Sequence, residues 1–146
     1  MKRSFLLLTL FAAAGVSFGA EQAAVGADGN SGFDESKIQA MELRLVTITD
    51  PATKLFFQAN IEREKGEPEN ALQILSKLIV HHASNEKWIA RSELLSAELY
   101  LEMGMLDAAD VTARQVQILH EGTDVAAKAG ALRSKIEELK KEMESK

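Results

Sequence analysis

Apolar side chains recur every three or four residues along most of the chain, which is the spacing of helices that bury one face. In the first such stretch, Ile38, Met41 and Leu45 lie on one helical stripe. The alternation of Met41, Leu43 and Leu45 also fits a strand, but no later segment offers a partner strand. We therefore predict an all-α chain of about six helices, at 34–48, 51–65, 68–82, 86–103, 106–120 and from 123 onward.

A glycine followed five residues later by an alanine occurs twice, each time between two of these stretches. Gly66 precedes Ala71, and 38 residues further along Gly104 precedes Ala109. Glycine ends a helix readily because it adopts a positive φ without a steric penalty. The repeat therefore predicts antiparallel helix hairpins with tight turns. Stacked hairpins of this kind form surfaces that hold other proteins.

Two of the predicted helices differ from the rest in their apolar pattern. In the helix at 68–82, Ile74 and Val80 widen the apolar arc, so we expect this helix to be the most enclosed. The last helix carries a heptad-like seam formed by Val125, Ala129, Leu132, Ile136, Leu139 and Met143. We expect this seam to pack on the preceding helix. Pairing with other copies of the chain, as a weak homo-oligomer, is the alternative.

The N-terminal residues follow the layout of a secretory signal peptide. A basic pair at 2–3 precedes an uncharged apolar run, and small residues stand before Ala20. We expect 1–19 to be a signal peptide, either cleaved or retained as an anchor, 20–33 to be a flexible leader, and 34–146 to be the helical domain. The pattern predicts export to the bacterial periplasm or secretion, without stable membrane insertion after cleavage.

The composition argues against several classes of chemistry. The chain has 17 basic and 22 acidic side chains, a net charge of −5, and no basic stripe for nucleic acid or an anionic membrane. It has no Cys, and it shows neither a phosphate-binding loop nor a Ser-His-Asp pattern. His81, His82 and His120 lack the spacing of metal ligands. We read the acidic cluster around Gly66 as solvated surface, and we predict no catalytic residue, metal or cofactor.

The stretch 56–119 resembles the tetratricopeptide repeat (TPR) family. In that family a turn glycine precedes a buried alanine by five residues, and a small residue lies seven positions before the glycine. Here the small residues are Ala59 and Ala97. Tyr100 matches the family's tyrosine, whereas Glu93 replaces a large side chain and the terminal proline is missing from both copies. The repeat of 38 residues is also longer than the family's length of about 34.

The resemblance implies a right-handed stack of antiparallel hairpins with a C-terminal capping helix, whose first-of-pair helices line a concave side. By position, the partner-binding residues would be Thr53, Phe56, Asn60, Arg63, Arg91, Leu94, Glu98 and Leu101. We therefore expect a non-catalytic scaffold or adaptor that binds another protein or peptide. A structural homo-oligomer formed through the last helix is the alternative. We expect Trp88 to pack at the edge of the core, with a binding role as its alternative.

Overall fold

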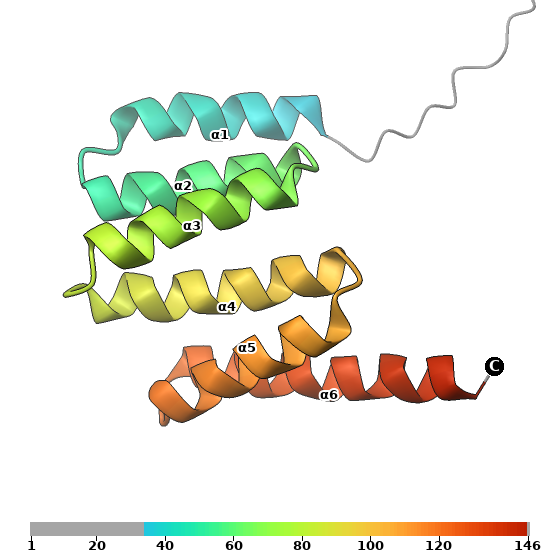
Figure 1. The fold of residues 1–146 in the computed structure, drawn as a ribbon. Helices are drawn as coiled ribbons and strands as arrows, with labels where there is room; N and C mark the ends of the chain where they lie inside the picture. Colours follow the sequence, from blue (N-terminus) through green and yellow to red (C-terminus); the bar gives the residue numbers. More distant parts are fainter. Residues whose placement is uncertain (1–33, 146) are drawn as a thin grey trace, which may run out of the picture. The chain divides into compact units, whose positions relative to one another are not determined.

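The computed structural model describes residues 34–145, and every regular element in this range is a helix (Figure 1). The helices are α1 (Glu35–Thr47), α2 (Pro51–Glu64), α3 (Pro68–His81), α4 (Glu86–Glu102), α5 (Leu106–Leu119) and α6 (Asp124–Glu144). The prediction of an all-α chain with six helices is confirmed for this range, including helix rather than strand after Met41. None of the described helices is long and apolar enough to cross a membrane. The predicted signal peptide at 1–19 and leader at 20–33 lie outside the described residues.

Side chains just before the helices set where several of them begin. Asp34, Asp50 and Thr123 each accept a hydrogen bond from the backbone amide three residues later. These bonds satisfy donors that the first turn of a helix leaves unpaired. Pro51 and Pro68 occupy the first position of α2 and α3, where an N–H would have no partner within the helix.

The two glycine turns share one geometry. Gly66 and Gly104 both have a φ of 74°, and the residue after each glycine donates its N–H to the carbonyl five residues earlier. This bond belongs to the common helix ending with a left-handed glycine. Ala71 and Ala109 behind the turns are fully buried. The repeat seen in the sequence is therefore also a repeat of backbone conformation.

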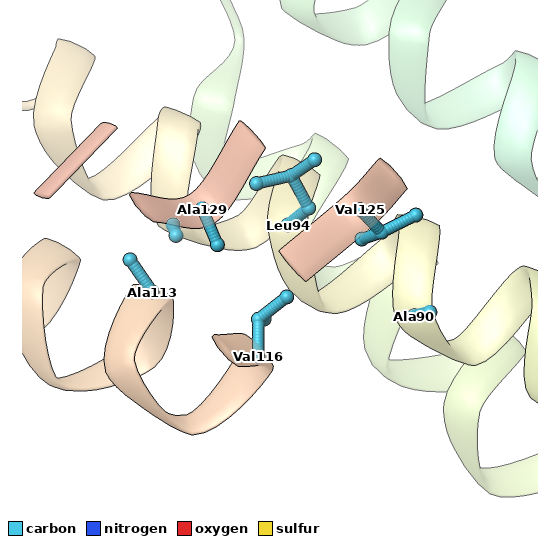
Figure 2. Packing of buried hydrophobic residues seen from close by; sticks show 7 residues of the cluster. Ala90, Leu94, Ala113, Val116, Val125 and Ala129 are labelled. Atoms are coloured by element: carbon cyan, nitrogen blue, oxygen red, sulfur yellow. The ribbon is translucent and has the colours of Figure 1, made fainter. Parts of the chain in front are cut away.

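Two clusters of buried apolar side chains hold the helices together. One cluster joins α2, α3 and α4 and consists of Ala59, Ala71, Leu75, Leu95 and Leu99. The other joins α4, α5 and α6 (Figure 2) and consists of Ala90, Leu94, Ala97, Ala113, Val116, Val125 and Ala129. The many alanines let helix axes approach closely. Because α4 contributes to both clusters, it connects the two parts of the core.

The expectation that the helix at 68–82 is the most enclosed is wrong. Helix α3 buries three residues, whereas α4 buries six. Val80, which widens the apolar arc of α3, is 71% exposed. The reason is position, since α3 packs against α2 and α4, while α4 packs against α2, α3, α5 and α6. The apolar arc of a single helix does not reveal how many neighbours surround it.

The seam of α6 packs on the preceding helix, as the sequence predicts. Val125 and Ala129 share a cluster with side chains of α5, and Ile136 is fully buried. Leu139 is partly buried, and Met143 at the end of the seam is 69% exposed. The same chain therefore covers most of the seam.

Candidate partner-binding groove

A depression of about 270 Å³ opens between α2, α4 and α6. We call it the first depression. It combines apolar, amide and charged side chains from three helices: Phe56, Asn60 and Arg63 of α2, Arg91, Leu94, Leu95 and Glu98 of α4, and Asp124, Val125 and Lys128 of α6.

A second depression of about 590 Å³ adjoins the first, with Arg63 and Glu98 in both linings. Its other residues lie further along α4 and α6: Leu101, Glu102, Leu132, Lys135 and Leu139. We call the two depressions together the groove. The groove thus follows α2, α4 and α6 with leucine side chains in both halves.

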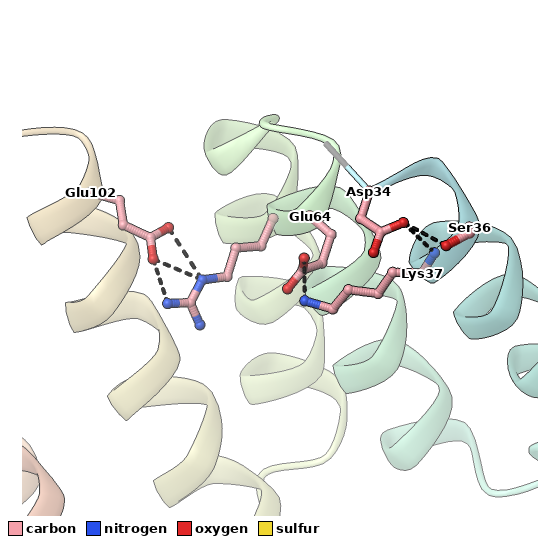
Figure 3. Close-up of polar contacts among 6 residues, drawn as sticks. Asp34, Ser36, Lys37, Glu64 and Glu102 are labelled. Carbon is pink, nitrogen blue, oxygen red and sulfur yellow. Dashed lines mark hydrogen bonds and ion pairs between the residues drawn. The ribbon is translucent and has the colours of Figure 1, made fainter. Parts of the chain in front are cut away.

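Arg63 separates the two halves of the groove and links α2 to α4. Its Nη1 lies 2.8 Å from Oε2 of Glu98. Its Nε donates to Oε1 of Glu102 at 2.9 Å, and its Nη2 donates to the same carboxylate (Figure 3). Burial opposes the charge, but the hydrogen bonds and charges of Glu102 and Glu98 outweigh it and raise the pKa of Arg63. The charge of Arg63 is therefore compensated within the chain.

An aromatic pair stands beside the first depression. The rings of Phe56 in α2 and Trp88 in α4 have centroids 5.0 Å apart and are tilted by 41°. The guanidinium carbon of Arg91 lies 5.2 Å from the centroid of the Trp88 ring. Both separations suit favourable aromatic and cation–π contacts. Trp88 is half-buried, so it packs at the edge of the core while also supporting a side chain of the groove.

The structure brings seven of the eight residues predicted from the sequence together around the groove. Six of them line the first depression: Phe56, Asn60, Arg63, Arg91, Leu94 and Glu98. Leu101 lines the second depression. Thr53 lines neither, and its hydroxyl donates to the Asp50 carboxylate that caps α2. The amide nitrogen of Asn60 donates to the Phe56 carbonyl at 2.8 Å, so this side chain is partly engaged within its own helix.

Sequence reasoning missed the contribution of α6 to the groove. Asp124, Val125 and Lys128 close the first depression on that side. The available signal was the repeat itself, since α6 starts 38 residues after α4, at 124 and 86. A helix that starts there stands one repeat length after α4, and α4 itself lines the groove.

A second missed feature lies outside the groove. Nε2 of His120, at the end of α5, is 2.9 Å from Oε2 of Glu93 in α4, and the two side chains are only 15% and 14% exposed. In the sequence, His120 stands out only as a histidine without metal-ligand spacing, and Glu93 only as a departure from the TPR pattern. A carboxylate in place of a large packing residue was the signal that a polar partner faces it.

The described residues hold no cluster of metal-ligand side chains. No three His, Cys, Asp or Glu side chains between 34 and 145 gather as a metal site would require. In the acidic cluster around Gly66, Glu62 and Glu64 form ion pairs with Lys65 and Lys37, the latter visible in Figure 3. Neighbouring lysines thus compensate part of the acidic cluster.

In comparisons with known proteins, the chain matches no family model, no curated protein and no solved structure.

Proposed function

We propose that this chain is a non-catalytic protein-interaction module, a scaffold or adaptor that holds a segment of another protein in the groove. The observation that supports this most is the convergence of seven residues, chosen from the sequence alone, around one groove. Phe56, Leu94 and Leu101 offer apolar surface, and charged side chains surround them. Apolar anchors inside a charged rim are typical of protein-binding surfaces.

The TPR-like architecture is part of the same proposal. We infer a right-handed stack of antiparallel hairpins, in which α2 pairs with α3, α4 pairs with α5, and α6 is the capping helix. The identical φ of the two glycines supports this arrangement, as do the matching bounds of α3 and α5, which begin at 68 and 106 and end at 81 and 119. The exposed face of α6 is rich in Lys and Glu, as a capping helix requires.

We also propose that the protein is exported to the bacterial periplasm or secreted. The support is the basic pair, apolar run and small residues of the first 19 positions. Intact-mass measurement of the protein isolated from separated cell fractions tests this. Loss of 1–19 from protein in the envelope or medium is expected, and a full-length chain confined to the cytoplasm would contradict export.

Affinity capture from the native cell envelope tests the binding function. We expect the double variant Phe56→Ala, Arg91→Glu to lose the captured proteins while keeping its helix content by circular dichroism. The matched control is Val111→Ala, Arg114→Glu, which also replaces one apolar residue by Ala and one Arg by Glu, on the exposed side of α5 and outside the groove. Equal capture by both double variants would remove the groove from consideration.

The alternative, a homo-oligomer formed through α6, has less surface available. Val125, Ala129 and Ile136 of the seam are already buried in the chain, which leaves Met143 and part of Leu132 and Leu139. Light scattering of the full chain separates the two proposals. A monomer throughout the micromolar range excludes the oligomer, and a dimer that dissociates on substitution of Met143 would favour it.

A further inference from the structure

We propose that the first depression selects a partner segment in which an acidic side chain stands beside an apolar one, and that Arg91 binds the carboxylate. This inference rests on the proposed function and adds to it the chemistry of the partner. Three observations carry it: the support of Arg91 by aromatic rings, the charges left without partners, and the apolar walls next to them.

The first observation is that Arg91 is both exposed and held in place. Its guanidinium carbon lies over the Trp88 ring, 5.2 Å from the centroid, and that ring in turn contacts Phe56. A guanidinium has planar N–H donors that can bind the two oxygens of a carboxylate while one of its faces contacts an aromatic ring. The aromatic support also lowers the conformational entropy that Arg91 would lose on binding.

The second observation is the charge balance of the first depression. Arg63 is compensated by Glu98 and Glu102, and Lys128 lies 3.6 Å from the Asp124 carboxylate. Arg91 forms no ion pair with any residue from 34 to 145. Lys87, which also lies over the Trp88 ring at 5.8 Å, forms none within that range either. Two cations thus stand beside the aromatic pair in a chain whose net charge is −5.

The third observation is what surrounds Arg91. Phe56, Leu94 and Val125 line the same depression and offer contact for an aliphatic side chain. Beyond Arg63 the second depression continues with Leu101, Leu132 and Leu139. A bound segment therefore has room to continue past the carboxylate. We assign the carboxylate to a side chain within that segment, and the peptides tested below distinguish it from a carboxylate at a chain terminus.

Selection from a library of displayed peptides with blocked termini tests the proposal on the full chain. We expect the enriched peptides to carry Asp or Glu next to an aliphatic residue. Their affinity follows from the fluorescence of Trp88, the only Trp of the chain. Because a charge-assisted hydrogen bond is lost, Arg91→Gln should weaken the binding of these peptides about tenfold or more. Arg91→Lys should recover part of the affinity, and Arg91→Glu should shift selection toward Lys-containing peptides.

Each other outcome has a distinct meaning. Enriched peptides without an acidic preference, but sensitive to Phe56→Ala, would overturn the carboxylate selection and leave the groove as the binding site. Enrichment only in a parallel library, whose peptides end in a free carboxylate, would overturn the assignment to a side chain. Peptides insensitive to both Phe56→Ala and Arg91→Gln, or no enriched peptide at all, would overturn the groove itself. The control Arg114→Gln on α5 should change none of these affinities.

Discussion

At the scale of single residues, Gly104 shows how one position can determine a turn. Its φ of 74° lies in the left-handed region, and a Cβ built there would meet no atom within 4 Å. The requirement for glycine therefore comes from the local backbone conformation and not from crowding by neighbouring segments. This is why the sequence could reveal the turn, since the constraint acts on the backbone of one residue and needs no knowledge of its neighbours.

Replacing Gly104 should therefore cost only the free energy of holding a residue with a Cβ in the left-handed conformation. We expect Gly104→Ala to lower the free energy of unfolding by about 1 kcal/mol. Gly104→Asn should lower the free energy of unfolding by less, because asparagine tolerates the left-handed conformation better than alanine does. Urea denaturation measures both. Gly122→Ala, at φ 79° and also without nearby atoms, should behave like Gly104→Ala, and an unchanged midpoint in both would contradict the argument.

Ser92 presents the opposite case, a buried residue whose polar group is not used. It is fully buried in α4, and its hydroxyl has no hydrogen-bond partner among the described residues. We expect Ser92→Ala to raise the free energy of unfolding by up to about 1 kcal/mol, because an unsatisfied hydroxyl is removed. Ser96→Ala is the matched control, since its hydroxyl donates to the Ser92 carbonyl at 2.8 Å. A loss of stability in Ser92→Ala would show that its hydroxyl is satisfied.

The pair of His120 and Glu93 marks what sequence reasoning could not reach at this scale. The two residues are 27 positions apart and meet only because α5 packs on α4. Helical periodicity places each residue on its own helix, but it does not set the rotation of one helix against another. Side-chain pairs between helices therefore became visible only with the structure.

At the scale of elements, the bounds of the helices were the most predictable feature. Caps, prolines and glycines act locally, so the starts of α2 and α3 at Pro51 and Pro68 follow from the sequence. The number of residues that each helix buries was less predictable, since α4 buries more residues than α3 despite the wide apolar arc of α3. An exposed Val80 and a buried Ser92 both depend on which helices lie alongside.

The seam of α6 allows a test of enclosure within one helix. Ile136 is fully buried, whereas Met143 is mostly exposed. We expect Ile136→Ala to lower the free energy of unfolding by about 2–4 kcal/mol through lost burial and a residual cavity. Met143→Ala should change it by less than about 0.5 kcal/mol. Denaturation of both variants in urea gives the comparison, and similar losses would mean that α6 packs differently.

At the scale of the whole molecule, ion pairs between helices add to the contacts of the buried core. Lys37 and Glu64 link α1 to α2, Arg63 links α2 to α4, and Lys140 of α6 pairs with Asp107 of α5. Hydrogen bonds within the caps add to these links. Together they make the stability of the fold depend on carboxylates remaining ionised.

Acid should therefore destabilise the fold. The hydrogen bonds from Thr53 lower the pKa of Asp50, and the hydrogen bond from Lys140 lowers the pKa of Asp107. A carboxylate whose pKa is lowered by folding contributes its full stabilisation at a pH above its unfolded-state pKa of about 3.9. That stabilisation disappears as the pH falls through the folded-state pKa. We expect the midpoint temperature of thermal unfolding to fall as the pH drops below about 4. In Asp50→Asn the midpoint should depend less on pH there, and parallel curves for the two proteins would contradict the assignment.

The candidate groove was predictable in part at this scale. Residues of α2 and α4 were found because they occupy equivalent positions in a repeat, which is a property of the sequence. The engagement of Arg63 by Glu98 and Glu102 was not, since those partners lie 35 and 39 positions away on another helix. The sequence could therefore suggest which residues gather, but not which charges remain available to a partner.

The shared register of the turns has a consequence for how such a chain can lengthen. Residues 86–123 begin with the first residue of α4 and end just before α6. A tandem duplication of this stretch would join Thr123 to Glu86, a capping threonine followed by an acidic residue, as Thr123 and Asp124 already stand. Lengthening by one such stretch would thus require no novel connection, and the proposed groove could be extended by copying alone.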